Sequence, residues 1–444
     1  MDFETLSLTE LAAHNHPNDA WIAVNGVVWD VTGFADLHPG GAGVIEETFG
    51  KDASQVYNGV HGPGLIGRHF GVEKKVGKLT GVIPSVDNDD SNTNSTREET
   101  SKPPLTSILS MRDFEQAAQQ RLSKKSWLYI SGASNDCHAA AANHEWFQRI
   151  FFKPRVLLDV AECDTNISIF GEKFDLPIFN APASLVKLAH PDGELAIARG
   201  MAGSGSTIIV PMFSSFSAGE IVESLPQNQP FFFQIYVNPD RAITAKALTG
   251  ICALKPKAII VTVDLPAFPK REEYERYEIQ TARHAAESML GGKSEKAPGE
   301  NNSRSAGRSI ASDLTWKDIT WVRRLTNLPV VVKGIQNAQD AKTALDLGCD
   351  GIYVSNHGGS ALDTAQPTIM TLLEIRVKYP EVFDRMEVFI DGGIRRGTDV
   401  LKCICLGAKG VCLGRPTLFA ATYGAVGVQH AMQCKYPGSN FNSF

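Results

Sequence analysis

Eight short apolar runs, separated by segments with helical spacing, dominate the chain from residue 177 onward. Each run is rich in β-branched or aromatic residues and is bounded by glycine, proline or polar positions, which is typical of buried strands. Most intervals between them are long enough for a helix, as in NAQDAKTALDLG (337–348). Eight strand–helix units over about 250 residues predict an α/β fold of the TIM (β/α)8 barrel type. The runs are PIFNAPA (177–183), STIIV (206–210), PFFFQIY (230–236), KAIIVTVD (257–264), LPVVVKG (328–334), GIYVS (351–355), MEVFID (386–391) and KGVCLG (409–414).

Polar residues stand at the ends of several of these runs. Gln234 and Tyr236, Asp264, Lys333 and Asp391 all occupy such positions. The carboxyl ends of the strands form the active-site face of this fold, so we expect these side chains to meet there. The longest insertion, residues 283–309, follows the fourth run. It is rich in Gly, Ser and Lys, and we expect a mobile loop or lid.

A polar, acidic stretch separates the barrel segment from the front of the chain. Residues 81–104 contain no aromatic residue and end in two prolines, so they cannot bury a core. We therefore predict three parts: a domain at 1–80, a flexible linker at 81–104 and the barrel domain at 105–444.

Composition excludes several classes of protein and partner. The net charge of −6 argues against a nucleic-acid binder, and no apolar run approaches the ~20 residues of a membrane span. The start of the chain has no apolar segment typical of a signal peptide. The eight cysteines form no CxxC pair, which favours free thiols in a reducing compartment over disulfides or a zinc site. We expect a cytoplasmic protein.

Two histidines in the front domain have the chemistry of haem ligands. His38 lies in HPGG (38–41), and His61 follows in YNGVHGPGL. Two imidazoles on opposite faces of a porphyrin would supply both axial ligands of a haem b iron. The alternative is a Pro-Gly turn beside an unrelated surface histidine.

Glycines and arginines follow the last two strands. Gly392 and Gly393, with Arg395 or Arg396, lie in DGGIRRGTDV (391–400), and GRP (414–416) contains Gly414 and Arg415. Backbone N–H groups and guanidinium groups at these two loops often bind a phosphate in TIM barrels. Alone, each motif is equally compatible with a surface turn.

An aspartate and a histidine form a candidate general-base pair. Asp264 ends the fourth strand and His357 follows the sixth, in SNHGG. A carboxylate beside an imidazole orients the ring and stabilises its protonated form. We expect Lys333 to point into the same open end of the barrel. Burying its charge there would cost free energy without an anionic partner, such as a reduced flavin. A structural ion pair and a structural histidine are the alternatives.

Taken together, these motifs resemble two known families. Residues 6–80, with DAWIAVNGVVWDVTGFADLHPGG, resemble a cytochrome b5 domain. Residues 105–430 resemble the FMN-dependent 2-hydroxy-acid dehydrogenases. The order of the two domains is that of the cytochrome-linked members that oxidise L-lactate. The motifs shared with the flavin family are FFKPRVLLDV (151–160), LAHPDGELA (188–196), FFQIYV (232–237), TVD (262–264), LTWKDITWV (314–322), VVVKG (330–334), SNHGG (355–359), DGGIRRGTDVLK (391–402) and LGRP (413–416).

The resemblance implies a role for each candidate residue. His357 would take the substrate proton while Asp264 stabilises the ring. Tyr236 would bind the substrate hydroxyl, Tyr129 the carboxylate, and Arg271 the carboxylate or developing charge. The implied ring ligands of FMN are Ala183 (backbone), Gln234, Thr262 and Lys333, and the implied ribityl and phosphate ligands are Asp391, Gly392, Gly393, Arg395, Gly414 and Arg415.

The implied partners also follow from the resemblance. Electrons would leave FMN singly for the haem and then for an external acceptor such as cytochrome c. Relatives form tetramers, so a homo-oligomer is expected, and relatives reside in the mitochondrial intermembrane space.

The sequence departs from the family at the substrate site. The family motif reads SNHGGRQLD, whereas this chain has SNHGGSALD, so Ser360 stands where an arginine grips the substrate carboxylate. Losing such a contact should cost about 2–4 kcal/mol, or roughly 30- to 1000-fold in efficiency. Pro211 stands where the family usually has a serine near the flavin, Phe213 falls at a position that lines the substrate side-chain pocket, and Pro269 replaces a glycine. A different, non-carboxylate substrate and a haem- and flavin-binding protein without turnover are therefore the alternatives.

Overall fold

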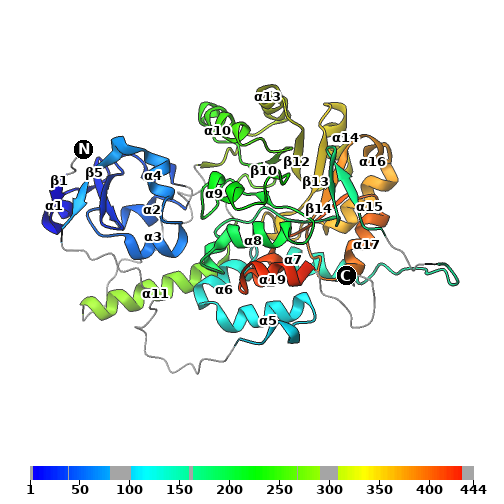
Figure 1. The fold of residues 1–444 in the computed structure, drawn as a ribbon, viewed down its shortest axis with the longest axis horizontal. Helices are drawn as coiled ribbons and strands as arrows, with labels where there is room; N and C mark the ends of the chain where they lie inside the picture. The colour runs from blue at the N-terminus through cyan, green and yellow to red at the C-terminus, as the bar shows by residue number, and fades with distance from the viewer. Residues whose placement is uncertain are drawn as a thin grey trace.

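The computed structural model describes residues 4–38, 40–80, 102–159, 164–267, 269–290 and 309–432. The first two ranges form a small α+β domain, blue in Figure 1, beside the much larger barrel domain. Its five-stranded sheet has the order β1-β5-β4-β3-β2. The strands are β1 (Glu4–Leu6), β2 (Asn15–His16), β3 (Asp19–Val24), β4 (Val27–Asp30) and β5 (Lys75–Leu79), and the helices are α1 (Leu8–Ala13), η1 (Ala35–Leu37), α2 (Ala42–Glu46), α3 (Ser54–Val60), α4 (Leu65–Phe70) and η2 (Val72–Lys74).

Each of the eight predicted barrel strands is present, and all eight pair in parallel in one sheet, in the order β8-β15-β14-β13-β12-β11-β10-β9. A bridge between Asn180 and Ile208 joins the two end strands and closes the barrel. The prediction of a TIM barrel is therefore confirmed. The strands are β8 (Ile178–Asn180), β9 (Ile209–Val210), β10 (Phe232–Ile235), β11 (Ile259–Thr262), β12 (Val330–Ile335), β13 (Gly351–Val354), β14 (Glu387–Ile390) and β15 (Gly410–Leu413).

Helices cover the outside of the barrel and the approach to its first strand. Helices α5 (Met111–Arg121), α6 (Lys124–Ser131) and α7 (His138–Phe147) precede the barrel. The helix expected at 337–348 is present as α14 (Ala338–Asp346). The remaining helices are η3 (Leu105–Ser107), η4 (Val186–Leu188), α8 (Gly193–Ala202), α9 (Ala218–Glu223), α10 (Arg241–Ala253), α11 (Glu272–Leu290), α13 (Trp316–Thr326), η6 (His357–Gly359), α15 (Thr368–Lys378), α16 (Glu381–Arg385), α17 (Gly397–Cys405), α18 (Arg415–Ala421) and α19 (Gly424–Met432).

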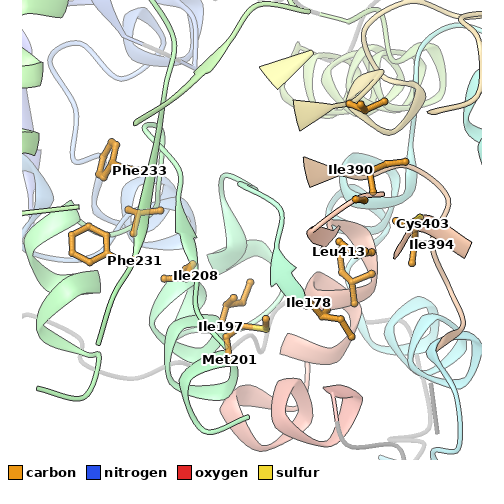
Figure 2. Close-up of a cluster of buried hydrophobic side chains, with 14 of the residues drawn as sticks. Ile178, Ile197, Met201, Ile208, Phe231, Phe233, Ile390, Ile394, Cys403 and Leu413 are labelled. Atoms are coloured by element: carbon orange, nitrogen blue, oxygen red, sulfur yellow. The ribbon is translucent and has the colours of Figure 1, made fainter. Parts of the chain in front are cut away.

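Two apolar layers hold the barrel together. The interior is filled by aromatic side chains, among them Phe179, Phe232, Tyr353 and Phe389, all essentially inaccessible to solvent. A hairpin of β6 (Ile167–Ile169) and β7 (Glu172–Phe174) packs against this interior. The outer layer lies between strands and helices. Figure 2 shows part of it, with Ile178, Ile197, Met201 and Ile208 labelled.

The boundaries of the linker and the insertion differ from the expectation. Residues 102–104 do not belong to a free linker, because the Lys102 ammonium lies over the Tyr423 ring and the Pro103 carbonyl accepts the Tyr423 hydroxyl. The insertion begins as a helix, because α11 continues to Leu290. Residues 81–101, 291–308 and the C-terminal tail from 433 lie outside the described residues.

The two domains contact each other directly. The Gly62 N–H donates to the Ser215 carbonyl at 2.7 Å, and Arg68 forms an ion pair with Glu220 at 2.8 Å. The His61 end of α3 thereby faces the loops that follow the first two barrel strands. Over the described part of the chain, no helix is both long and apolar enough to cross a membrane.

Candidate active site and haem site

The predicted base pair is formed at the carboxyl ends of β11 and β13. His357 Nδ1 lies 2.9 Å from Asp264 Oδ1. Burial alone would raise the pKa of Asp264, but Lys333, His357 and the hydrogen bond from His357 together hold this pKa below its usual value. Because the carboxylate is ionised it can only accept, so Nδ1 carries the proton and Nε2 is free to act as a base.

The backbone around this pair is specialised for close approach. His357 has φ 58°, a left-handed conformation that is uncommon for a residue with a side chain. Gly334 has φ 112°, and a Cβ there would lie 2.6 Å from the Asp264 Cβ. The sequence places a glycine where β12 must pass close to the aspartate.

Lys333 is almost fully buried between two carboxylates. Its Nζ lies 3.7 Å from Asp264 and 4.0 Å from Asp391, and it donates to Ser355 Oγ at 3.1 Å. Ser355 Oγ in turn donates to Asp391 and accepts the N–H of His357. Lys333 is part of an ion-pair network, which agrees with the alternative of a structural ion pair. This network also fixes the loop that carries His357.

Tyr236, Tyr129 and Arg271 gather near the same mouth. Burial, with the nearby Asp264 charge, raises the pKa of Tyr236, so its hydroxyl remains protonated and can donate. The Arg271 guanidinium lies 4.4 Å from the centre of the Tyr129 ring and donates to the Tyr129 carbonyl. Its Nε is buried without a hydrogen-bond partner among the described residues, a donor that an anion could satisfy.

The residues assigned to the flavin ring lie on adjoining strands. Gln234 donates to Thr262 Oγ1 at 2.9 Å and accepts the Met212 N–H. Both side chains are buried, and Ala183 lies half-buried in the loop after β8. Together with Lys333 on β12, they form a polar band across neighbouring strand ends, consistent with recognition of a ring with several acceptors.

Arg395 and Arg415 lie at the predicted phosphate loops, and Arg271 is close enough for its charge to act on Arg415. Burial, and then the charges of Arg395 and Arg271, lower the pKa of Arg415 to about 10. Arg415 donates to the carbonyls of Gly358 and Gly132, and Arg395 pairs with Glu115. A Cβ on Gly414 would meet only Ala181, at 3.9 Å, so the backbone is accessible there. Arg415, which has no ion-pair partner among the described residues, lies near the open backbone of Gly414, and this combination fits a phosphate group.

The positions that depart from the family motif lie in the same region. Ser360 is buried and follows the short η6 turn, with its N–H donated to the His357 carbonyl. Phe213 stacks on Tyr236 with ring centres 5.4 Å apart. Because Ser360 is uncharged, position 360 supplies no positive charge in place of the missing arginine.

The two candidate haem ligands face each other in the small domain. The rings of His38 and His61 are 6.0 Å apart at an angle of 82°. A metal bound by two imidazole nitrogens at about 2 Å each would fit between such rings. A Cβ on Gly40 would approach the His38 ring to 2.7 Å, so a side chain at this position would displace the ring from its present place.

The electrostatics of these histidines also suit a metal. Burial lowers the pKa of His38, and burial together with His38 lowers the pKa of His61 to about 4. Both rings are therefore neutral at pH 7, the form that binds metal. His61 Nδ1 is buried without a hydrogen-bond partner among the described residues. Phe34 lies beside the His38 ring and packs against Phe70 within the apolar core of this domain.

Several supporting residues were not predicted from the sequence. Asn143 of α7 and Asn356 exchange two side-chain amide hydrogen bonds of 2.8 and 2.9 Å, which joins α7 to the histidine loop. Asp363 accepts the N–H groups of Ala139 and Asp136 at the start of the same helix. Asn356 and Asp363 belong to the SNHGGSALD stretch, but the pairing with α7 is visible only in three dimensions.

Comparison with known proteins gives the same two-part organisation. The model of FMN-dependent dehydrogenases matches residues 118–435, and that of the cytochrome b5-like haem/steroid binding domain matches residues 7–80. The L-lactate dehydrogenase (cytochrome) of Saccharomyces cerevisiae is 38% identical over 98% of this chain and 76% of its own. The glycolate oxidase of Spinacia oleracea is 37% identical over 73% of this chain and 88% of its own.

Solved structures agree with the fold. The flavin-binding domain of baker's yeast flavocytochrome b2 superimposes with a TM-score of 0.67, at 38% identity, over 75% of this chain and 81% of that one. A mandelate oxidase with (S)-mandelic acid gives a TM-score of 0.62 at 33% identity, over 74% and 91% of the two chains.

Proposed function

The chain belongs to the FMN-dependent dehydrogenases, in the group with an N-terminal cytochrome b5-like domain, and from this we propose that it oxidises an L-2-hydroxy acid similar to lactate. The observation that carries the proposal is the buried pair of Asp264 and His357 at the strand ends. It lies beside a polar band for the flavin ring and a cluster of arginines for the phosphate. The product is the corresponding 2-oxo acid.

The protein residues perform the acid–base part of this oxidation. His357 Nε2 removes a proton from the 2-hydroxy acid as the acid is oxidised, and Asp264 stabilises the imidazolium that results. The protonated Tyr236 hydroxyl donates to the substrate oxygen, while Arg271 and Tyr129 neutralise and orient the carboxylate. When bound, FMN would accept the electron pair together with the second hydrogen that the substrate loses, and haem b would pass electrons on singly. Gln234, Thr262, Lys333 and the Ala183 backbone hold the ring, and the residues that hold the ribityl and phosphate groups are Asp391, Gly392, Gly393, Arg395, Gly414 and Arg415.

His38 and His61 are the residues that would hold the haem. With both ligands supplied by the protein, the haem would supply one-electron transfer rather than oxygen binding. A one-electron acceptor protein such as cytochrome c is the proposed external partner. The direct contact between the domains supports intramolecular transfer before that step.

We also propose assembly into a homo-oligomer and a cytoplasmic location. An exposed apolar stretch supports assembly: Phe151, Val156 and Leu157 are 84%, 81% and 100% exposed. The cysteines of the described residues are free thiols, which supports a reducing compartment. Light scattering of the purified protein and cell fractionation test these two points.

The visible spectrum of the purified protein tests the proposed activity. Under anaerobic conditions, L-lactate, glycolate, mandelate and longer L-2-hydroxy acids are added in turn. At least one should bleach the flavin band and produce the bands of reduced haem, whereas the His357→Gln variant should remain oxidised. A flavin that no hydroxy acid reduces would overturn the proposal.

The replacement of the usual arginine by Ser360 favours a second candidate, a neutral substrate. A hydroxy ester or amide has no carboxylate for an arginine to bind. Methyl lactate and lactamide therefore belong in the same panel. Faster flavin reduction by either than by lactate would favour this candidate, and reduction by neither acids nor esters would favour a protein without turnover.

A further inference from the structure

The loop after the first barrel strand places a lysine against the haem domain. Lys187, in η4, donates from Nζ to the His61 carbonyl at 2.8 Å and also to the Asn58 carbonyl. These carbonyls lie at the C-terminal end of α3, the negative end of the helix dipole, where a cation is stabilising. Lys187 belongs to the barrel domain. It is thus hydrogen-bonded to the backbone of a proposed haem ligand in the other domain.

No carboxylate of the described residues lies within 4 Å of the Lys187 ammonium. The side chain is half-buried, so water screens its charge only partly. Its field therefore reaches the slot between His61 and His38. A positive charge there favours the reduced, less positive state of an iron bound to these histidines.

A buried carboxyl group fixes the platform that carries this lysine. Glu194 is fully inaccessible, and its Oε1 accepts the N–H of Val186 at 3.2 Å and the N–H of Ser215 at 3.0 Å. The Lys187 N–H donates to Ser215 Oγ, and the Ser215 carbonyl accepts the N–H of Gly62. One glutamate thus joins the two barrel loops that contact the haem domain.

Close packing completes the contact. A Cβ on Gly62 would lie 2.7 Å from the Phe216 ring, so this glycine allows the ring to lie against the backbone next to His61. At the rim, Arg68 pairs with Glu220 and donates to Ser217 Oγ at 2.6 Å. Lys187 is therefore held in one place relative to the haem domain.

We propose that Lys187 is a positioning residue for electron transfer between the domains, and that in the docked arrangement its charge raises the reduction potential of the haem. The inference rests on the proposed function for its role in turnover, but the effect on the potential does not depend on the substrate. By linkage, reduction of the haem should strengthen docking by the same factor.

A redox titration of the full-length holoprotein tests the proposal. The variants are Lys187→Met, which removes the charge, Lys187→Arg, which keeps it, and Lys246→Met on the exposed face of α10 as the matched control. The haem midpoint potential, measured with chemical reductants and mediators, should be lower in Lys187→Met. It should be close to wild type in the other two variants.

The rate of electron transfer from flavin to haem provides the second readout. Loss of the charged donor should slow it by roughly tenfold to a hundredfold in Lys187→Met, while reduction of the flavin itself is unchanged. An unshifted potential in Lys187→Met, or an equal shift in Lys187→Arg or Lys246→Met, would overturn the inference. If no hydroxy acid reduces the flavin but the potential still shifts, the proposed activity fails and the inference stands.

Discussion

At the residue scale, the charge of Asp264 is the feature on which the proposed chemistry depends most. The Asp264→Asn substitution keeps the shape of the side chain but removes the negative charge beside His357 and Lys333. We expect flavin reduction by the best hydroxy acid to slow by about 10²- to 10⁴-fold, the usual contribution of general-base catalysis. Stopped-flow absorbance measures this rate. The exposed Asp346→Asn variant is the control, and an Asp264→Asn rate within about twofold of wild type would contradict the assignment.

Ser360 stands where the family motif has an arginine that binds the substrate carboxylate. The Ser360→Arg variant should restore a charged donor and raise kcat/KM for lactate by roughly 30- to 1000-fold. Ser360→Met, of similar length but neutral, controls for the added volume. Equal activity of the arginine and methionine variants would show that the missing charge is not what limits turnover.

His61 gives the haem-free protein a distinct dependence on pH. Its pKa is lowered from about 6.5 in the unfolded chain to about 4 in the folded one. Between these values the unfolded state binds a proton that the folded state does not, so stability falls as the pH decreases from 6.5 to 4. The loss from this residue is about 3 kcal/mol.

Urea unfolding of the haem-free protein at pH 7 and pH 4.5 measures the effect. His61→Leu should show a clearly smaller loss of stability between the two pH values than wild type. The same loss in both proteins would mean that the burial of His61 does not contribute to it.

Single residues also mark how far sequence reasoning extends. His357, Asp264 and the two candidate haem ligands lie in short motifs with strong local character, and the structure places each pair in contact or facing. Lys187 carries no such signal, because its partners Asn58 and His61 lie more than a hundred positions away along the chain. The pairing of Arg395 with Glu115 was equally invisible from the sequence.

At the element scale, α7 supports the histidine loop through its paired asparagines. Asn143 and Asn356 are both buried, so Asn143→Ala leaves the amide of Asn356 without its main partner. We expect a loss of about 1–3 kcal/mol in the free energy of unfolding. Thermal unfolding followed by circular dichroism measures it, with exposed Gln148→Ala near the end of α7 as the control.

The same substitution should also slow flavin reduction, because the loop that carries His357 loses a support. A variant with lowered stability but an unchanged rate would show that α7 stabilises the fold without positioning the base.

Strands were more predictable than the boundaries around them. Apolar runs with β-branched residues mark buried parallel strands because both of their faces are covered, and each of the eight was located. The residues that end the linker and begin the insertion were misjudged. Lys102 and Pro103 contact Tyr423, and composition does not reveal such contacts. The first residues of the insertion continue helix α11, which composition also does not reveal.

At the scale of the whole molecule, the two domains contact each other directly. The small domain lies beside the barrel domain (Figure 1), and the His61 end of α3 contacts the loops that carry Lys187 and Ser215. The proposed base, anion site and flavin site all belong to the barrel domain. The order of domains could be predicted from the sequence because each has its own motifs. The interface could not, since its contacts join residues more than a hundred positions apart.

Rapid mixing of the oxidised protein with its best L-2-hydroxy acid, without oxygen, tests the central claim most directly. Absorbance is followed at the flavin and haem bands together. The flavin should be reduced first, and the haem should follow at a rate that does not depend on protein concentration, as expected for transfer within one chain. Haem that stays oxidised while the flavin is fully reduced, or a flavin that never responds, would contradict the account.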